Sequence, residues 1–530
     1  MSRRERRPEG RVIHFRTVVT AAGALVVCGL ACIVPARGDV VPAACFGSHM
    51  VLQRDLPLPV WGTAASGERV TVSFGGGAAT TVADAEGRWQ VRLAPQAASD
   101  EPRALVIRGA NEVRCDDVLV GEVVLCAGQS NMLLPLAQAD EAALEIAAAD
   151  RPRLRLLTLH AAAGGDPPAY TSEQIRDLVP ARFCTGSWEV STPQTARSFS
   201  AVGYFLGAAV GDELGVPVGV ICAAVGGAPT ESWIGRRALA GDRRLAPLVQ
   251  GDWMHNPALA GWCVTRAGQN LARARQAGEP IPGDPLGPNH PFKPGFLHES
   301  CIAPLAPLAI RGVAWYQGES NADSPARVAQ HAALLPVLVA DWRRAWGRAD
   351  LPFAVVQLPG MDRPDWPAFR ETQRRAVADL ARAALVVTID LGRKTDVHPP
   401  DKRPVGERLA RWAVAEARGR AGADASGPLP VGATLRPDGG VTIRFRPEGA
   451  NLRTTDGEPP RHFEVADGDG AFVAAVARIE GDTVVVTPPA GVAPRRVRYA
   501  WRPFPEPPVN LVDPDGIPAA PFEVDVVTGE

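Results

Sequence analysis

The chain has 530 residues, of which 46% are hydrophobic and 22% are charged, so it is a globular protein too long for one hydrophobic core. A chain of this length divides into roughly two to four domains. The formal net charge of -2, with Lys and Arg matched by Asp and Glu along the chain, argues against nucleic acid as a partner.

The first residues have the features of a targeting segment. Residues 17–34 form an apolar run, and residues 36–38 give the small-x-small pattern that signal peptidases cut. Six arginines precede this run, namely Arg3, Arg4, Arg6, Arg7, Arg11 and Arg16. We therefore expect residues 1–38 to be a signal peptide and the protein to be exported, to the periplasm or the extracellular space. A retained membrane anchor is the alternative, because the run is close to the shortest length that spans a bilayer.

Both ends of the remaining chain have the pattern of β-sheet. Short, often alternating runs separated by Gly, Pro and Asp fill residues 40–115, as in a small sandwich or barrel. The same pattern returns in residues 430–530, after a Gly-, Ala- and Pro-rich stretch at 419–432 that is typical of a linker. We therefore predict all-β, sandwich-like modules at both ends of the chain.

Residues 116–420 alternate apolar runs with helix-like segments. Five apolar runs each end in a small or polar turn, at residues 128–131, 226–227, 318–321, 359–360 and 392. This alternation predicts an α/β domain built on a doubly wound parallel sheet. Because the carboxyl ends of parallel strands meet at one edge of the sheet, we expect the polar turns to converge there.

The first of these runs ends at a serine. Residues 117–128 are mostly apolar and predict a strand buried on both faces. The turn that follows carries Ser130 at the carboxyl end of the strand, and Pro135 fits the first turn of a following helix. Ser130 is therefore a candidate nucleophile. The alternative is an ordinary strand-to-helix turn in which the serine caps the helix.

The last polar turn contains a histidine and an acid. Asp396 and His398 precede Pro399, which favours extended backbone before a helix expected at 404–418. Residues two apart in an extended segment point to the same side, so the carboxylate and the imidazole share a face. A carboxylate that reaches the imidazole fixes its tautomer, which makes His398 a candidate general base and Asp396 its orienter.

Seven cysteines remain outside the targeting segment, and they show no CxxC or Cys/His metal spacing. They are Cys45, Cys115, Cys126, Cys184, Cys222, Cys263 and Cys301. Cys126 and Cys222 lie in apolar runs and fit small buried side chains. An exported protein can form one or two disulfides among the others, and the pairing is left open by the sequence.

Four blocks in order carry a resemblance to a known family. They are residues 128–132 (GQSNM), 226–233 (GGAPTESW), 315–321 (WYQGESN) and 396–400 (DVHPP). In order and composition they resemble the sialate O-acetylesterase family, a branch of the SGNH hydrolases. The resemblance extends over about residues 46–522 and implies an SGNH-type α/β core.

The resemblance also implies roles for individual residues. Ser130 is expected as the nucleophile and His398 as the general base, oriented by Asp396. The backbone N–H groups of Ser130 and Gly227 are expected to donate hydrogen bonds to the oxyanion.

The third block, residues 315–321, is expected to add a side-chain donor to this oxyanion hole. We favour the amide of Gln317 or Asn321, because an amide donates hydrogen bonds and an unprotonated carboxylate does not. The wider SGNH group has its acid three residues before the histidine, whereas the gap here is two. Glu319 or a backbone carbonyl is therefore the alternative orienter of His398.

The sequence as a whole predicts a serine esterase that removes acetyl groups from an O-acetylated glycan through an acyl-enzyme. No metal or organic cofactor is expected, and no membrane contact other than an uncleaved N-terminal segment. Two alternatives stay open. In the first alternative, the substrate is an acetylated polysaccharide such as xylan instead of a sialic acid. In the second, the chain is a glycan-binding protein with a decayed hydrolase domain.

Overall fold

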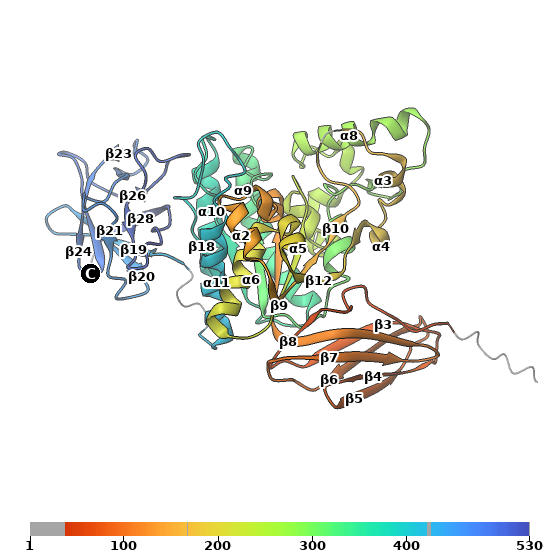
Figure 1. The fold of residues 1–530 in the computed structure, drawn as a ribbon. Coiled ribbons are helices and arrows are strands. Elements are labelled where there is room, and N and C mark those ends of the chain that lie inside the picture. The colour runs from red at the N-terminus through yellow and green to blue at the C-terminus, as the bar shows by residue number, and fades with distance from the viewer. Residues whose placement is uncertain (1–37, 167, 421–425, 529–530) are drawn as a thin grey trace, which may run out of the picture.

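A computed structural model describes residues 38–166, 168–420 and 426–528. The expected targeting segment therefore lies outside the described residues, except for Gly38. Figure 1 shows a central α/β body with one β module beneath it and a second β module at its side. None of the helices in the described ranges combines the length and apolarity needed to cross a membrane.

The central body is organised around a mainly parallel sheet. Its strands follow the order β12-β9-β13-β8-β16-β17-β18, with β12 antiparallel to β9 and the other neighbours parallel. The strands are β8 (Glu112–Gly128), β9 (Arg151–Thr158), β12 (Trp188–Ser191), β13 (Val218–Ala224), β16 (Gly312–Tyr316), β17 (Phe353–Val356) and β18 (Ala383–Val386). The α/β class predicted from the alternating pattern is confirmed.

Helices cover both faces of this sheet (Figure 1). Val124 and Cys126 of β8 pack in a core cluster with α6 (Ala201–Leu214) and α11 (Arg403–Ala417). Leu125 and Ala127 point the other way, into the cluster that contains α9 (Pro325–Ala345) and α10 (Trp366–Asp379). Successive residues of a strand face opposite sides, so an unbroken apolar run is what a sheet covered twice requires.

Shorter elements fill the space around the sheet. The helices are α1 (Ser130–Leu133), α2 (Ala142–Ala147), α3 (Ser172–Arg176), α4 (Pro180–Phe183), α5 (Pro193–Ser198), α7 (Arg236–Gly241) and α8 (Gly261–Gln276). The strands are β10 (His160–Ala161), β11 (Cys184–Thr185), β14 (Gly283–Asp284) and β15 (Gly287–Pro288). A disulfide joins Cys184 to Cys301 across a sequence separation of 117 residues, and the five other cysteines within the described ranges are buried and free.

The N-terminal β module shares a strand with the central sheet. Its strands are β1 (Val41–Pro42), β2 (Val51–Gln53), β3 (Leu58–Thr63), β4 (Arg69–Phe74), β5 (Gly77–Val82), β6 (Arg88–Leu93) and β7 (Ser99–Arg108). The 17 residues of β8 pair with β7 in their first half and with β13 and β16 in their second half. One continuous strand therefore crosses the boundary that the sequence pattern suggested near residue 115.

A buried ionic cluster reinforces this joint. Glu122, in the middle of β8, is 1% exposed and accepts hydrogen bonds from Arg54 Nε at 2.6 Å and Arg311 Nε at 2.7 Å. Gln53 adds a further donor at 3.1 Å. Two arginines and an amide satisfy the carboxylate, which offsets the cost of removing its charge from water.

The C-terminal β module packs against α10. Its main sheet contains β19 (Leu429–Leu435), β20 (Val441–Arg446), β22 (Phe463–Ala466), β23 (Val473–Ala474), β24 (Val476–Glu480), β25 (Thr483–Thr487), β26 (Arg496–Tyr499) and β28 (Phe522–Thr528). β21 (Arg453–Thr454) and β27 (Leu511–Val512) form a separate pair. The buried Arg370 of α10 donates to the carbonyl of Pro503 at 3.3 Å, which ties this module to the central body.

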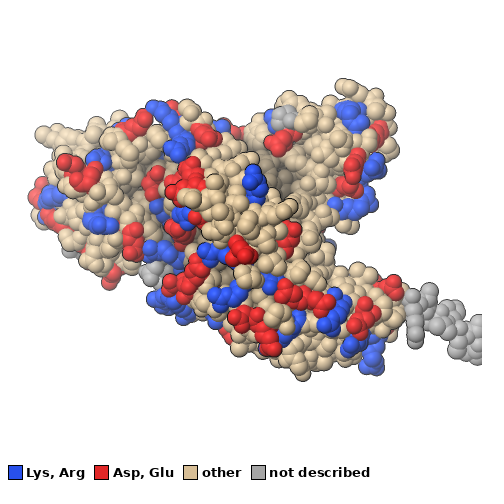
Figure 2. All heavy atoms as spheres, viewed as in Figure 1, with Lys and Arg blue, Asp and Glu red and all other residues tan. Residues whose placement is uncertain are grey.

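Charge is evenly mixed on the face seen in Figure 2, where Lys and Arg alternate with Asp and Glu. This distribution agrees with the small net charge of the sequence. Such a face lacks the extended basic surface with which proteins bind nucleic acid.

Candidate active site

Ser130 lies at the carboxyl end of β8 and begins the short helix α1. The chain turns there because of Gly128, which has a φ of 144°. A Cβ atom on this residue would lie 2.0 Å from the carbonyl oxygen of Tyr316 on the neighbouring strand. Only glycine allows this close approach, so the sequence Gly-Gln-Ser raises the serine hydroxyl to the edge of the sheet.

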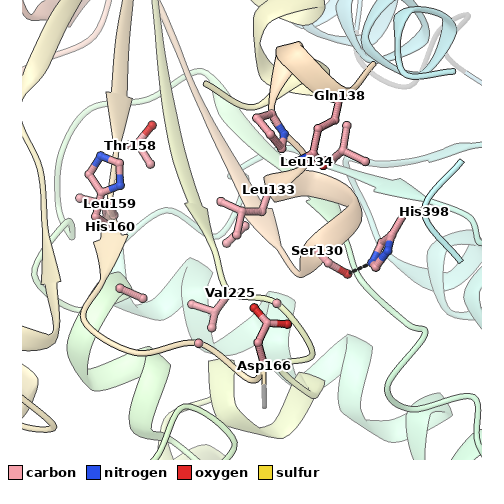
Figure 3. Close-up of a pocket in the computed structure, with 15 residues that line it drawn as sticks. Ser130, Leu133, Leu134, Gln138, Thr158, Leu159, His160, Asp166, Val225 and His398 are labelled. Carbon is pink, nitrogen blue, oxygen red and sulfur yellow. Dashed lines mark hydrogen bonds between the residues drawn. The ribbon is translucent and has the colours of Figure 1, made fainter. Parts of the chain in front are cut away.

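His398 meets this serine from the segment between β18 and α11. Its Nε2 atom lies 2.7 Å from the Oγ atom of Ser130, as the dashed line in Figure 3 shows. The pair joins residues that are 268 positions apart in the sequence. With the proton of the neutral imidazole on Nδ1, Nε2 accepts the serine proton, which is the contact that a general base needs.

The surroundings of His398 favour its neutral form. Burial lowers the pKa of the imidazole, and the nearby Lys402 lowers it further, whereas Asp396 and Asp166 raise it. The net shift is downward from the ordinary value of 6.5. The side chain is therefore unprotonated, and able to accept a proton, at neutral pH.

The Asp396 carboxylate does not hold the imidazole ring as the sequence pattern led us to expect. Its Oδ1 atom accepts a hydrogen bond of 2.8 Å from the backbone N–H of His398. An Asp side chain readily bonds the main chain two residues ahead, and this local turn competes with a contact to the ring. Asp396 therefore shapes the segment that carries His398, and its charge acts on the imidazole without a hydrogen bond.

Two backbone N–H groups are free to bind an oxyanion. Those of Ser130 and Gly227 have no acceptor among the described residues. Gly227 has a φ of 72° and follows β13, whose Ala224 is in register with Gly128. The residues that carry these N–H groups border one cavity, since Ser130, Gly227 and His398 all line it.

Gln317 and Asn321, the expected side-chain donors, are turned away from this cavity. Both are fully buried, and Gln317 Nε2 donates to Asn321 Oδ1 at 2.7 Å. Asn321 Nδ2 donates in turn to Glu231 at 2.9 Å. The NH₂ groups of both amides thus already have acceptors inside the protein. The buried carboxylate of Glu231 binds the Asn321 amide, and Asn321 in turn binds the Gln317 amide. The expectation that one of them reaches the oxyanion is not supported by this geometry.

Gln129 is the amide that faces the cavity, and the sequence reasoning missed it. Its Oε1 atom accepts from Gln317 Nε2 at 3.2 Å and from the backbone N–H of Ser320 at 3.4 Å. These two donors fix the orientation of the amide, whose Nε2 group has no acceptor among the described residues, and Gln129 lines the cavity together with Ser130. The adjacency of Gln129 to Ser130 was the only signal in the sequence.

Glu319, the alternative orienter, contacts Asn131 instead of His398. Its Oε1 atom accepts from Asn131 Nδ2 at 2.5 Å, and burial raises the pKa of its carboxyl group. The other oxygen, Oε2, is buried without a partner among the described residues. Among the described residues, Glu319 is thus linked by hydrogen bonds to the segment of His398 through Asn131.

Two cavities flank the Ser130–His398 pair. The first, of about 370 Å³, is drawn in Figure 3 and is bordered by Leu133, Leu134 and Val225 besides the pair. The second, of about 410 Å³, is bordered by Gln129 and Gly227 and by Trp262, Arg266 and Arg363. An ester carbonyl at Ser130 can thus place its acyl and alcohol parts in separate spaces. Within the described ranges, no cluster of three or more His, Cys, Asp or Glu side chains is arranged to hold a metal ion.

Comparisons with known proteins agree with this site. The family model "Carbohydrate esterase, sialic acid-specific acetylesterase" matches residues 297–415. The sialate O-acetylesterase of Rattus norvegicus is 28% identical over 434 residues, which are 73% of this chain and 75% of that protein. The human sialate O-acetylesterase is 26% identical over 426 residues, 73% of each chain.

A solved structure is similar over almost the whole chain. It is a carbohydrate acetylesterase from Xanthomonas citri, with a TM-score of 0.73 and 31% sequence identity over 92% of this chain and all of that one. The chain belongs to the sialate O-acetylesterase family of carbohydrate esterases. It is a carboxylic ester hydrolase whose reaction is the removal of O-acetyl groups from glycans.

The first prediction concerns the serine. We expect Ser130→Ala to abolish turnover of a small acetate ester such as p-nitrophenyl acetate, because only the attacking oxygen is removed. The first position of a short helix accepts alanine, so circular dichroism should be unchanged. Turnover equal to that of the unaltered protein would exclude Ser130 as the nucleophile.

The second prediction concerns the two acids. Asn at position 396 keeps an oxygen for the His398 N–H, and Gln at position 319 keeps one for Asn131. We therefore expect Asp396→Asn and Glu319→Gln each to lower kcat far less than the roughly 10⁴-fold loss of the Asp→Asn change in a chymotrypsin-type triad. Measuring kcat of both variants on one acetate ester tests whether either acid orients the imidazole of His398. A loss near that value in Asp396→Asn would mean that the carboxylate binds the ring during catalysis.

Proposed function

We propose that the deacetylation is carried out by Ser130 and His398 in an SGNH-type active site. The observation that carries this proposal is the 2.7 Å contact between the imidazole Nε2 and the serine Oγ at the carboxyl edge of a parallel sheet. Open α/β sheets bind their ligands at this edge. Ser130 and His398, which are far apart in the sequence, meet at this edge with the geometry of a nucleophile and its base.

The reaction that follows from this geometry has two halves. Ser130 Oγ attacks the carbonyl carbon of the acetyl ester while its proton passes to His398 Nε2. The imidazolium then gives this proton to the sugar oxygen as the ester bond breaks, which leaves an acetyl group on Ser130. Water attacks the acetyl-enzyme with His398 again as the base, and acetate is released.

The oxyanion that forms in each half is expected to bind three donors. They are the backbone N–H groups of Ser130 and Gly227 and the side-chain amide of Gln129. Donors of this kind act in a pre-formed, partly water-excluded site, and loss of one typically lowers kcat by about 10² to 10³-fold. Asp396 stabilises the imidazolium through its charge, opposing the burial that disfavours it.

For the glycan, we favour an acidic sugar of the sialic acid type. Arg266 and Arg363 border the cavity beside Ser130, and neither forms an ion pair with another described residue. Trp262, which is 36% exposed, offers an apolar surface on the same wall. Asp166 and Asp323 also line this cavity, so its wall carries two carboxylates besides the two guanidinium groups. An acetylated neutral polysaccharide such as xylan is the alternative substrate.

We also propose that the protein is exported and that its three modules span residues 40–115, 116–420 and 430–530. The Cys184–Cys301 disulfide supports export, because disulfides persist in oxidising compartments. The arginine-rich start and apolar run of the sequence support it independently.

The test is acetate release from three substrates: acetylated sialosides, acetylated xylo-oligosaccharides and acetylated peptidoglycan fragments. We expect the highest kcat/KM on the sialosides. Arg266→Gln should raise KM for a sialoside and leave turnover of p-nitrophenyl acetate unchanged, because the guanidinium contacts only the sugar acid. Arg275→Gln, an exposed arginine on the same helix outside the cavities, is the matched control.

Three outcomes would contradict parts of this proposal. A preference for xylo-oligosaccharides, unaffected by Arg266→Gln, would favour the neutral polysaccharide. Equal effects of Arg266→Gln and Arg275→Gln would remove Arg266 from the substrate site. Release of no acetate from any substrate, with retained glycan binding, would favour the non-catalytic alternative.

A further inference from the structure

Asn131 links the two catalytic segments. It follows Ser130 directly, and its Nδ2 group donates a hydrogen bond of 2.8 Å to the backbone carbonyl of Val397, the residue before His398. The side chain is fully buried. One amide therefore bridges the turn that carries the hydroxyl and the segment that carries the imidazole.

The orientation of this amide is fixed by its neighbours. Lys402 Nζ donates to Asn131 Oδ1 at 2.5 Å, and Glu319 Oε1 accepts from Asn131 Nδ2 at 2.5 Å. An ammonium group only donates hydrogen bonds, whereas a carboxylate and a carbonyl only accept them. A flipped amide would direct its NH₂ group at the ammonium and its oxygen at the carboxylate and Val397, so only one orientation is compatible.

Lys402 is an unusual residue to find in this position. It is 1% exposed, and burial lowers the pKa of its ammonium group to about 8. Its Nζ atom also lies 5.5 Å from the centre of the Tyr316 ring. A lysine removed from water lowers stability unless its charge is compensated, and here Glu319 is the main compensating charge. The position directly before α11 attaches the ammonium group to a rigid helix.

We propose that Lys402 and Asn131 are positioning residues that hold His398 in hydrogen-bond reach of Ser130. Lys402 locks the Asn131 amide, the amide holds the Val397 carbonyl, and the imidazole of the next residue is thereby kept on the serine hydroxyl. The inference rests on the proposed roles of Ser130 and His398. In this proposal, Lys402 contributes to the reaction without contacting the substrate.

The charge of Lys402 also acts on His398. The imidazole faces Lys402 from the start of α11, Asp396 from its own segment and Asp166 from the segment after β10. Across the cavity it faces Glu319, Asp323, Arg266 and Arg363. Lys402 is the cation that lowers the pKa of His398, so its removal raises this pKa and delays deprotonation of the base as pH rises.

The experiment compares Asn131→Asp and Lys402→Met in the full chain. Asp at position 131 has the size of Asn and keeps an acceptor for Lys402, but it has no donor for Val397. We expect a fall in kcat of about 10²-fold on p-nitrophenyl acetate, the typical effect of a small misplacement of reacting groups. For Lys402→Met we expect a lower kcat and an acid limb of the kcat/KM profile displaced to higher pH, with the KM for this ester little changed.

Lys293→Met is the matched control. Lys293 is also fully buried and pairs with Asp284 at 2.8 Å, away from both cavities beside Ser130. We expect its loss to lower the melting temperature without displacing the acid limb. The comparison separates the general effect of removing a buried lysine from the specific effect on His398.

The proposal fails if Asn131→Asp retains kcat within about threefold of the unaltered protein, since such a loss is too small for a misplaced base. It also fails if Lys402→Met leaves the acid limb in place, or if Lys293→Met displaces it equally. Should Lys402→Met not fold, as judged by circular dichroism, the result for Asn131→Asp decides alone. A fully active Ser130→Ala in the same series would instead refute the proposed function.

Discussion

The active site depends on the register of three parallel strands. Gly128 at the end of β8 is level with Ala224 of β13 on one side and Tyr316 of β16 on the other. The three loops that follow therefore begin at the same height and supply Ser130, Gly227 and Glu319. A slip of one residue in either pairing would turn strand side chains to the opposite face and separate these loops.

Behind Ser130 and His398 lies a buried polar network. Glu231, 1% exposed, is paired with the guanidinium of Arg327 at 2.6 Å and accepts the amide of Asn321. Asn321 in turn accepts from Gln317, whose amide donates to Gln129 beside the serine. A buried charge of this kind contributes little net stability, but it determines how each amide is oriented. As a result, the oxygen of the Gln129 amide is held by Gln317 and Ser320, and within the described ranges its NH₂ group has no acceptor.

The pattern of the sequence was sufficient for the main elements. Apolar runs that end in small turns indicated the parallel strands, and the helix expected at residues 404–418 corresponds to α11 at Arg403–Ala417. Ser130 and His398 were also singled out, because the serine after a buried apolar run and the histidine two residues after Asp396 were both expected at the edge of one sheet.

The remaining features depend on three-dimensional neighbours that spacing alone does not specify. The extended pattern placed Asp396 and His398 on one face. In the structure, however, the Asp396 carboxylate accepts a hydrogen bond from the backbone N–H of His398 instead of binding the imidazole ring. The orientation of Gln317 and Asn321 depends on Glu231, which lies in the block at residues 226–233 but whose buried contacts with Arg327 and Asn321 the sequence did not indicate. Lys402 belongs to none of the sequence blocks, and only the packing of α11 against the sheet brings it to Asn131.

The proposed mechanism requires that His398 activates Ser130 as the nucleophile. Its most direct test is covalent labelling with a dialkyl p-nitrophenyl phosphate, which an activated serine attacks with release of p-nitrophenolate, followed by peptide mass mapping. We expect one dialkylphosphoryl group per chain, on the peptide that contains Ser130, and loss of labelling in His398→Ala. Labelling at a different residue, or equally fast labelling of Ser130 in His398→Ala, would contradict it.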